Sequence, residues 1–378
     1  MRVLSVFGTR PEAIKMAPVV QALKMDAGVE SLICVTAQHR EMLDQVLKLF
    51  NIEPTVDLNI MQPNQSLAEL TAAVITQLDP VLEKLQPDWI LVQGDTTTVM
   101  AAAMTAFYRR IRIGHVEAGL RTGDKWQPFP EEMNRHVAGV LADLHFAPTA
   151  WARQNLLNEN IPSDRILVTG NTVIDALHMI TALPAPDETI SLLQQIGISP
   201  AEKQPFGKKL VLITAHRREN FGTPLENICE AIRDLANRYR DHAHFVYPVH
   251  LNPNVQNPVN RILGKLPNVT LLPPMDYLPW VHLLKYAALV LTDSGGIQEE
   301  APGLGVPVLV MREITERPEG VEAGTVRLVG ANRQRIVAEA RRLLDDPQEH
   351  AQMAHAVNPY GDGHAAERIV RAIIDYQD

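Results

Sequence analysis

The sequence predicts an α/β protein made of two domains, each built on a parallel sheet with crossover helices. Short apolar segments rich in β-branched residues alternate with helical patterns along the chain, which is typical of such sheets. The 378 residues exceed what one hydrophobic core usually serves. The segment 181–187, which has two prolines and weak periodicity, is the best candidate for a linker between the domains.

The expected strands form two groups, one on each side of that linker. In the first group they span residues 3–7, 32–36, 89–93, 111–116, 145–147 and 166–169. In the second group they span residues 210–214, 244–249, 269–272, 288–292, 306–310 and 326–329. A last helix at 365–376 is expected to return to the first domain. The predicted domains are therefore 1–182 with 359–378, and 183–358.

Composition and charge narrow the classes of function. A net charge of −9 argues against a nucleic-acid partner, because the phosphates would meet a repulsive field. A small anionic ligand stays possible, since salt screens distant charge. The two cysteines, Cys34 and Cys229, lie in a strand pattern and a helix pattern, so no disulfide framework is predicted. No apolar run has membrane length, and Arg10 and Glu12 interrupt any signal peptide, so we expect a cytoplasmic protein.

The most informative stretch is a buried strand followed by a tight turn of Ser294, Gly295 and Gly296 and then by a helix that carries Glu300. Glycine removes the Cβ where a backbone must approach another group closely. The first N–H groups of a helix attract negative charge, so such a turn suits a phosphate. Glu300, about one turn further, suits the hydroxyls of a sugar diol. The alternative is a turn whose glycines serve packing alone.

Polar residues also follow the strands of the first group, where parallel sheets bind ligands. Arg10 and Lys15 follow the first strand and face either a ligand or solvent. Asp95 follows the third strand and either joins a site or caps the next helix. Glu117 ends an apolar strand, which a solvated surface does not explain, so we favour a function. Glu131 begins a predicted helix, where the helix dipole alone explains a carboxylate.

The strands of the second group end in a comparable set. His216 and Arg217 follow the strand 210–214, and His250 follows the next one. Histidines at two strand ends, beside arginine, indicate a charged ligand. Trp280 either lies in the core or stacks on a flat base, and Arg317 either reaches a diphosphate or pairs with a neighbouring glutamate.

Taken together, these segments resemble the non-hydrolysing UDP-N-acetylglucosamine 2-epimerases of bacteria. The resemblance runs from residue 2 to Arg368. It is specific because the motifs are many, long and in order. They are FGTRPEAIK at 7–15, TAQHR at 36–40, GDTTT at 94–98, HVEAGLRTG at 115–123, HRREN at 216–220, TDSGGIQEE at 292–300 and NPYGDG at 358–363.

The resemblance implies two Rossmann-like domains that face each other across a cleft, a GT-B-like arrangement, in a homodimer. The Ser-Gly-Gly turn would hold the diphosphate of the nucleotide, Glu300 the ribose and Trp280 the uracil, although relatives usually have phenylalanine at position 280. The implied substrate-binding residues are Arg10, Lys15, Asp95, Glu117, Arg135, His216, Met275, Trp280, Ser294, Gly295, Gly296, Glu300 and Arg317. The implied catalytic residues are Asp95, Glu117, Glu131 and His216.

Once that substrate is granted, chemistry limits the mechanism. The C2 proton of the sugar is not acidic, so the enzyme either oxidises the sugar with NAD or expels UDP from C1 as a carboxylate removes the proton. The chain lacks a Gly-x-Gly-x-x-Gly turn after its first strand, so a bound dinucleotide cofactor is not expected. No metal site is predicted. Proton return to the opposite face gives UDP-N-acetylmannosamine. Asp95 and Glu131 are the leading acid/base pair, while Glu117 and His216 assist.

The resemblance also implies that a second UDP-N-acetylglucosamine acts as an activator. The matching positions are Gln38, Gln65, Arg217 and His250, and relatives often have glutamine where this chain has Glu41 and arginine where it has Asn64. Three other functions stay open. They are a hydrolysing 2-epimerase, a UDP-sugar glycosyltransferase of the same fold and a non-catalytic UDP-sugar sensor.

Overall fold

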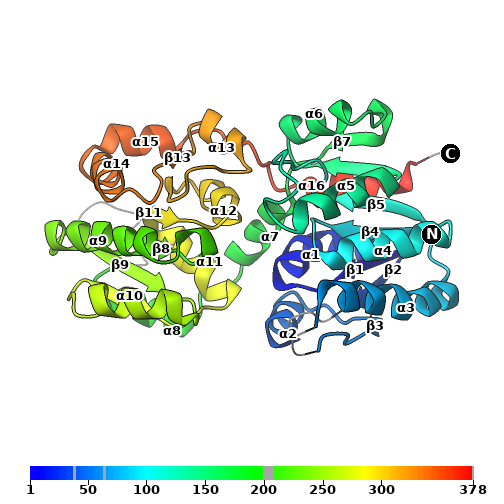
Figure 1. Ribbon diagram of the computed structural model, residues 1–378, viewed down its shortest axis with the longest axis horizontal. Coiled ribbons are helices and arrows are strands. Elements are labelled where there is room, and N and C mark those ends of the chain that lie inside the picture. Colours follow the sequence, from blue (N-terminus) through cyan, green and yellow to red (C-terminus); the bar gives the residue numbers. More distant parts are fainter. Residues whose placement is uncertain (37–39, 63–64, 199–207, 377–378) are drawn as a thin grey trace. The chain divides into compact units, whose positions relative to one another are not determined.

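A computed structural model describes residues 1–36, 40–62, 65–198 and 208–376 of the chain. The chain divides into two compact units (Figure 1). Unit 1 comprises Met1–Met179 and Tyr360–Asp378, and unit 2 comprises Ile180–Pro359. The predicted linker at 181–187 starts at the last residue of helix α7 (Thr172–Thr181) and ends where α8 (Asp187–Gln195) begins.

The described part of unit 1 holds a seven-stranded parallel sheet in the order β3-β2-β1-β4-β5-β6-β7. Its strands are β1 (Arg2–Phe7), β2 (Glu30–Val35), β3 (Val56–Asp57), β4 (Trp89–Gln93), β5 (Arg112–Val116), β6 (Leu144–Ala147) and β7 (Ile166–Val168). From β1 the chain first adds strands on one side (β2, β3) and then on the other (β4 to β7). The ends of β1 and β4 therefore lie at a topological switch point. Ligands bind at such points in open α/β sheets.

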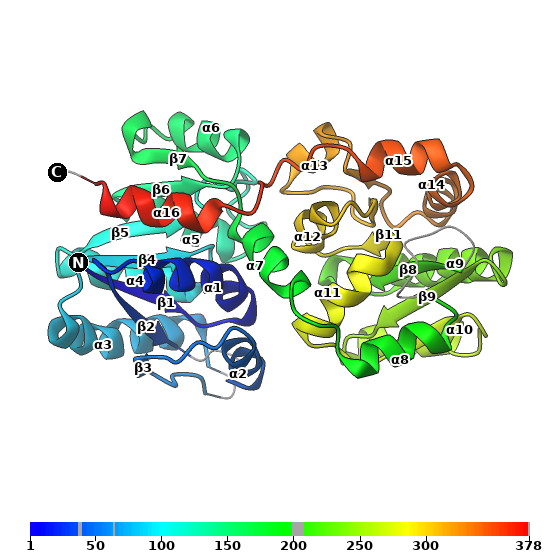
Figure 2. The ribbon, with the colours of Figure 1, turned by 180° about the vertical axis from the view of Figure 1, so that it is seen from behind.

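Helices cover both faces of this sheet. They are α1 (Arg10–Met25), α2 (Arg40–Leu49), α3 (Leu67–Leu85), α4 (Thr97–Tyr108), α5 (Glu131–Leu141), α6 (Ala150–Asn158), α7 and α16 (Ala365–Ile374). Helices α3, α4 and α5 lie together on one face of the sheet, whereas α16 packs against α1 on the other face (Figure 2). Val6 and Val92 of the sheet share a buried core with Leu78 of α3 and Ala102 of α4. The last helix therefore returns to unit 1.

The described part of unit 2 holds a six-stranded parallel sheet in the order β10-β9-β8-β11-β12-β13. Its strands are β8 (Lys209–Thr214), β9 (Ala243–Pro248), β10 (Val269–Leu272), β11 (Ala287–Thr292), β12 (Val308–Val310) and β13 (Val326–Leu328). Its helices are α8, α9 (Thr223–Arg238), α10 (Pro253–Leu263), α11 (Tyr277–Tyr286), α12 (Ile297–Gly303), α13 (Pro318–Glu322), α14 (Arg333–Asp345) and α15 (Pro347–Ala354). The order reverses between β8 and β11, which again places a switch point beside the Ser-Gly-Gly turn.

The predicted fold class, two parallel-sheet α/β domains, is confirmed. The strand β3 was missed, because two residues are too short to give a hydrophobic pattern. β2 starts earlier than predicted, since Glu30 pairs with Arg2 in the sheet although neither residue is apolar. β12 starts later than predicted, because the Val306 N–H bonds back to the Ala301 carbonyl at the end of α12.

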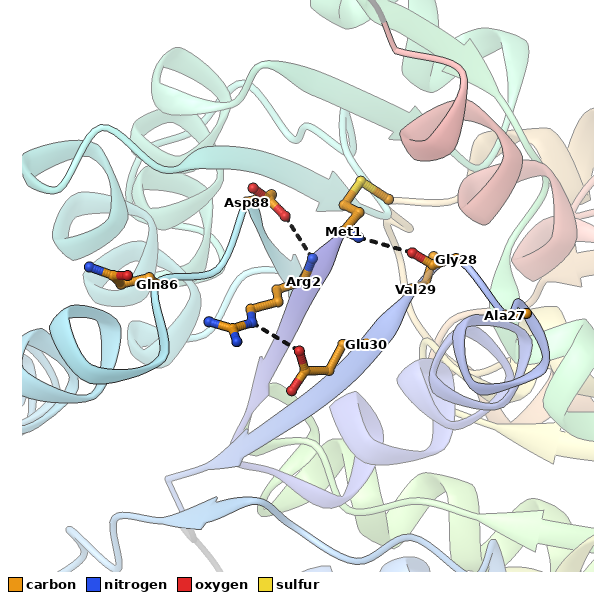
Figure 3. Close-up of a pocket in the computed structure, with 8 residues that line it drawn as sticks. All are labelled: Met1, Arg2, Ala27, Gly28, Val29, Glu30, Gln86 and Asp88. Atoms are coloured by element: carbon orange, nitrogen blue, oxygen red, sulfur yellow. Dashed lines mark hydrogen bonds and ion pairs between the residues drawn. The ribbon is translucent and has the colours of Figure 1, made fainter.

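A shallow pocket lies at the amino-terminal end of the unit 1 sheet (Figure 3). Its charged groups bind one another: the Arg2 guanidinium donates to Glu30 at 2.9 Å, and the Arg2 N–H donates to Asp88 at 2.7 Å. The pocket lies at the opposite end of β1 from Gly8, where the polar loops begin. The functional site is therefore expected at the carboxyl ends of the strands. None of the described helices is both long and apolar enough to cross a membrane.

Candidate active site

A buried carboxylate joins the loops that follow β1 and β4 in unit 1. Glu12 and Thr9 form a capping box at the start of α1. The Glu12 carboxylate accepts hydrogen bonds from Gly8 N at 2.9 Å and Thr9 N at 2.7 Å, and the Thr96 hydroxyl also donates to it. Burial raises the pKa of Glu12 above its usual value. The two loops are thus held together at the switch point by a residue that the sequence analysis did not single out.

Asp95 is held by a buried arginine rather than by a helix. The Nη2 of Arg135 donates to the Asp95 carboxylate at 2.6 Å, and the Asn134 side chain donates to the Asp95 carbonyl at 2.8 Å. The helix cap of α4 is Thr96, so the alternative that Asp95 caps this helix is wrong. About a quarter of the Asp95 side chain (26%) stays exposed. The carboxylate is therefore oriented and still accessible.

Two consecutive carboxylates at the start of α5 have different surroundings. Glu132 is buried; it accepts from the N–H groups of Thr122 and Gly123 at 3.0 and 3.1 Å and from Arg135 at 3.0 Å. The Oε2 of Glu131 is buried without a hydrogen-bond partner within the described part of the chain. Because a buried carboxylate oxygen without a donor is costly, this atom is suited to a ligand or a proton. The helix dipole alone does not explain that difference.

Glu117 follows β5 in a strained conformation. Its φ of 64° lies in the left-handed region, which is uncommon for residues other than glycine and clusters at functional sites. Its buried carboxylate pairs with Lys15 and accepts from Asn171 Nδ2 at 3.1 Å. His115, at the end of the same strand, bonds the Gly94 carbonyl at 2.8 Å, and burial lowers its pKa to about 4. Lys15 thus faces the site rather than solvent.

In unit 2 the Ser-Gly-Gly turn packs against Arg317. A Cβ at Gly295 would lie 2.7 Å from the Arg317 Nη1 atom, so glycine permits this approach. Arg317 pairs with Glu299 and, at 2.6 Å, with Glu316, as the pairing alternative predicts. Although burial pushes the pKa of Glu316 up, Arg317 and Arg312 hold it at about 2. Helix α12 begins at Ile297 with no side-chain cap.

Apart from Arg10, the residues implied for the nucleotide lie in unit 2. Glu300 is buried on α12, and Trp280 is buried on α11 with 7% of its surface exposed. The burial of Trp280 fits the packing alternative. Met275 lies half-buried between β10 and α11, and Arg10 begins α1 in unit 1.

His216 and His250 are brought together in unit 2. Their rings stack with centroids 5.4 Å apart and planes 8° apart. Partial burial lowers the pKa of His216. The next residue, Arg217, caps a short 3₁₀ turn at Arg218–Asn220. A predicted catalytic residue thus lies beside two residues predicted for the activator.

The other predicted activator residues belong to unit 1. The Oε1 of Gln65 accepts from Gln62 N at 3.4 Å. Gln38 and Asn64 lie outside the described residues. Within the described ranges, no group of three or more His, Cys, Asp or Glu side chains could hold a metal ion.

Comparisons with known proteins show the family of this chain. A family model described as UDP-N-acetylglucosamine 2-epimerase matches residues 21–374. This chain belongs to that family. The epimerase of Escherichia coli K12 is 58% identical over 376 residues, which are 99% of this chain and 98% of that one. The epimerase of Salmonella typhimurium is 57% identical over 380 residues, 100% of this chain and 99% of that one.

A solved structure of the UDP-GlcNAc 2-epimerase from Neisseria meningitidis, bound to UDP-GlcNAc, covers all of both chains. Its TM-score is 0.90 at 50% sequence identity. The resemblance to non-hydrolysing bacterial 2-epimerases is therefore confirmed, and the chain is an isomerase of the 2-epimerase family.

Proposed function

We propose that this 2-epimerase interconverts UDP-N-acetylglucosamine and UDP-N-acetylmannosamine by eliminating and re-adding UDP. The observation that carries the mechanism is the set of carboxylates at the carboxyl edge of the unit 1 sheet. Asp95 is oriented by Arg135, Glu117 is paired with Lys15, and a buried oxygen of Glu131 has no hydrogen-bond partner among the described residues. Inversion at carbon needs proton transfer on opposite faces, hence at least two such groups.

The reaction balances without a redox partner. A carboxylate takes the C2 proton, the electrons of the C–H bond form a C1=C2 double bond, and the C1–O bond breaks to release UDP. The intermediate is 2-acetamidoglucal. A proton then returns to C2 from the opposite face while UDP re-adds at C1. Each well-placed acid or base contributes about 10²–10⁴ in rate.

Asp95 and Glu131 are the leading acid/base pair. α5 links them, because Asn134 of this helix bonds the Asp95 carbonyl and Glu131 begins the same helix. Glu117 assists the elimination, and its carboxylate is paired with Lys15. His216 assists by stabilising charge at the phosphate or at C2.

UDP binds mainly to unit 2 in this proposal. The Ser-Gly-Gly turn offers N–H groups to the diphosphate, with Arg317 already packed against Gly295 and Arg10 contributing from unit 1. Held in this way, UDP is a good leaving group. Glu300 takes the ribose hydroxyls, and Met275 and Trp280 line the uracil site.

Two further proposals concern assembly and regulation. The enzyme acts in the cytoplasm as a homodimer, and its product feeds the synthesis of a surface polymer. A second UDP-N-acetylglucosamine, bound by Gln38, Gln65, Arg217 and His250, activates it.

Proton NMR of the reaction in D₂O tests the mechanism. Removal and return of the proton by side chains places deuterium at C2 of the product. Product with only protium at C2 contradicts the elimination. Free N-acetylmannosamine with UDP as the main products indicates the hydrolysing reaction, and binding of UDP-sugar without turnover indicates a sensor.

A further inference from the structure

A buried aspartate that the sequence analysis did not single out lies directly before the Ser-Gly-Gly turn. Asp293 has none of its surface exposed. Its Oδ2 accepts three hydrogen bonds, from His216 N at 2.9 Å, Arg217 N at 2.8 Å and Asn220 Nδ2 at 3.0 Å. The Asp293 N–H donates to the Thr214 carbonyl at 3.0 Å, so the ends of β8 and β11 are joined on both sides of this residue.

The second oxygen of this carboxylate faces the imidazole of His216. Asp293 Oδ1 has no hydrogen-bond partner within the described ranges, and it lies 3.6 Å from His216 Nδ1. That distance is an ion-pair contact only when His216 is protonated, and it is too long for a hydrogen bond. Hydrogen bonds that serve catalysis are often long before a ligand binds and shorten in the complex. A buried carboxylate oxygen without a donor is costly, which favours such shortening.

We propose that Asp293 is a positioning residue that holds the imidazole of His216 with its proton on Nδ1. Nε2 is then directed away from Asp293 as an acceptor that is able to take up a proton, and once protonated it donates to the diphosphate. The inference rests on the function proposed above for His216. Because Ser294 follows Asp293 directly, one carboxylate sets both the orientation of the histidine and the start of the diphosphate-binding turn.

The groups around His216 give this carboxylate a second effect. Burial is the main influence that lowers the pKa of His216, and the neighbouring His250 and Arg217 lower it further, whereas Asp293 raises it. The stacked ring of His250 accepts a hydrogen bond at Nδ1 from Asn252 N at 3.1 Å, so neutral His250 carries its proton on Nε2. The two stacked rings therefore hold their protons on different nitrogens. Asp293 is the anion that stabilises an imidazolium at His216.

The rival explanation is that Asp293 acts only as a staple, meaning that its Oδ2 fixes the loop 216–220 by hydrogen bonds and has no effect on the imidazole. Asp293→Asn separates the two roles. Its amide oxygen can still accept the three donors, whereas its NH₂ group faces His216 Nδ1 and forces this nitrogen to accept. A positioning role therefore predicts that the proton of His216 moves to Nε2, while a staple predicts no change of tautomer.

Long-range ¹H–¹⁵N NMR of the imidazole rings measures this directly, with the signals of His216 assigned by loss in His216→Gln. We expect the Nδ1–H form in the native protein, free and with UDP, and the Nε2–H form in Asp293→Asn. The pKa of His216 in the same spectra should fall in Asp293→Asn, because the stabilising anion is gone. An Nε2–H form in the native protein, or an unchanged tautomer in the variant, overturns the proposal.

Asn220→Ala is the matched control. It removes one donor from Oδ2 and leaves Oδ1 untouched, so a positioning role predicts the Nδ1–H form in this variant, with or without some loss of stability. If Asp293→Asn does not fold, the native protein and Asn220→Ala still decide the question. The tautomers are measured without turnover. The test of the Asp293 proposal is therefore valid even if His216→Gln proves active and His216 has no catalytic role. If that role holds, Asp293→Asn should lower kcat about tenfold or more, with the Kd for UDP changed less.

Discussion

The carboxyl edges of the two sheets use charge in different ways. In unit 1, carboxylates meet cationic side chains, as Asp95 meets Arg135 and Glu117 meets Lys15. In unit 2, Arg317 likewise pairs with Glu299 and Glu316, whereas the buried carboxylate of Asp293 is held by two main-chain N–H groups and an amide. Unit 1 thus presents carboxylates that are oriented by neighbouring cationic side chains. Unit 2 presents a glycine turn backed by Arg317, which suits an anion.

The two edges share one device. Glu12 in unit 1 and Asp293 in unit 2 are both buried carboxylates that accept main-chain N–H groups and join loops from adjacent strands at a switch point. In our proposal the leading acid/base pair belongs to unit 1 and most of the anion binding to unit 2, and each edge is fixed by an internal carboxylate. Substitutions on the two edges should therefore have different kinetic consequences.

The largest effects are expected on the unit 1 edge. Glu131→Gln and Asp95→Asn each remove an acid/base group, so kcat should fall by about 10²-fold or more. The Kd for UDP, measured by calorimetry, should change little. Asp79→Asn is the matched control, because Asp79 also pairs with an arginine, Arg109, at 2.6 Å but lies on α3 away from the strand ends. Near-normal turnover of Asp95→Asn would leave Asp95 with a structural role only.

The unit 2 edge should show the reverse pattern. In Gly295→Ala the new Cβ meets Arg317, so the guanidinium must move, whereas a Cβ at Gly296 meets no protein atom within 4 Å. Loss of a charged hydrogen bond costs about 1.5–3 kcal/mol, so Gly295→Ala should weaken UDP binding about tenfold or more. If Gly296→Ala also binds UDP more weakly, the reason is instead that UDP itself lies against the backbone at this position. Equal Kd values for UDP in both variants and the native enzyme would remove the turn from the binding site.

These tests bear on what the sequence could reveal. The two sheets were predictable because the strands other than the two-residue β3 each carry an apolar pattern, and Glu117 stood out as a carboxylate at the end of such a strand. Asp293 did not, because its acceptor role depends on His216, 77 residues away in the chain. Glu12 was equally hidden, since a capping box looks the same whether it is buried or exposed. Local patterns find elements and motifs, whereas contacts between loops need the fold.

Activation by substrate should be a smaller effect. Two ligands that favour one state help each other, typically by about 1–3 kcal/mol. We expect a sigmoidal rate dependence on UDP-N-acetylglucosamine and a lag in the reverse reaction that a trace of this substrate removes. Gln38→Ala combined with Arg217→Ala should flatten the sigmoid while UDP still binds. A hyperbolic forward curve with no lag in reverse would show that this chain lacks the activator site.

The smallest effect concerns stability and compares two capping boxes within unit 1. Thr9 with Glu12 and Ser66 with Glu69 form the same motif at the starts of α1 and α3. Burial raises the pKa of Glu12 above 4.5, whereas the Ser66 N–H and hydroxyl lower the pKa of the exposed Glu69 below 4.5. The pKa of the glutamate at the same motif position is therefore shifted in opposite directions in the two boxes.

The signs of the two pH dependences follow by linkage. Between pH 4.5 and the raised pKa of Glu12, the folded protein binds more protons than the unfolded chain, so the free energy of unfolding falls as the pH rises. A tenfold change in proton affinity corresponds to about 1.4 kcal/mol. Glu69 stabilises the fold above pH 4.5, and this stability is lost as the pH falls through its lowered pKa. Urea unfolding from pH 3 to 7 should show Glu12→Gln gaining and Glu69→Gln losing stability relative to the native protein as the pH rises. Parallel curves for both variants would contradict the assignment of Glu12 as a buried carboxylate with a raised pKa.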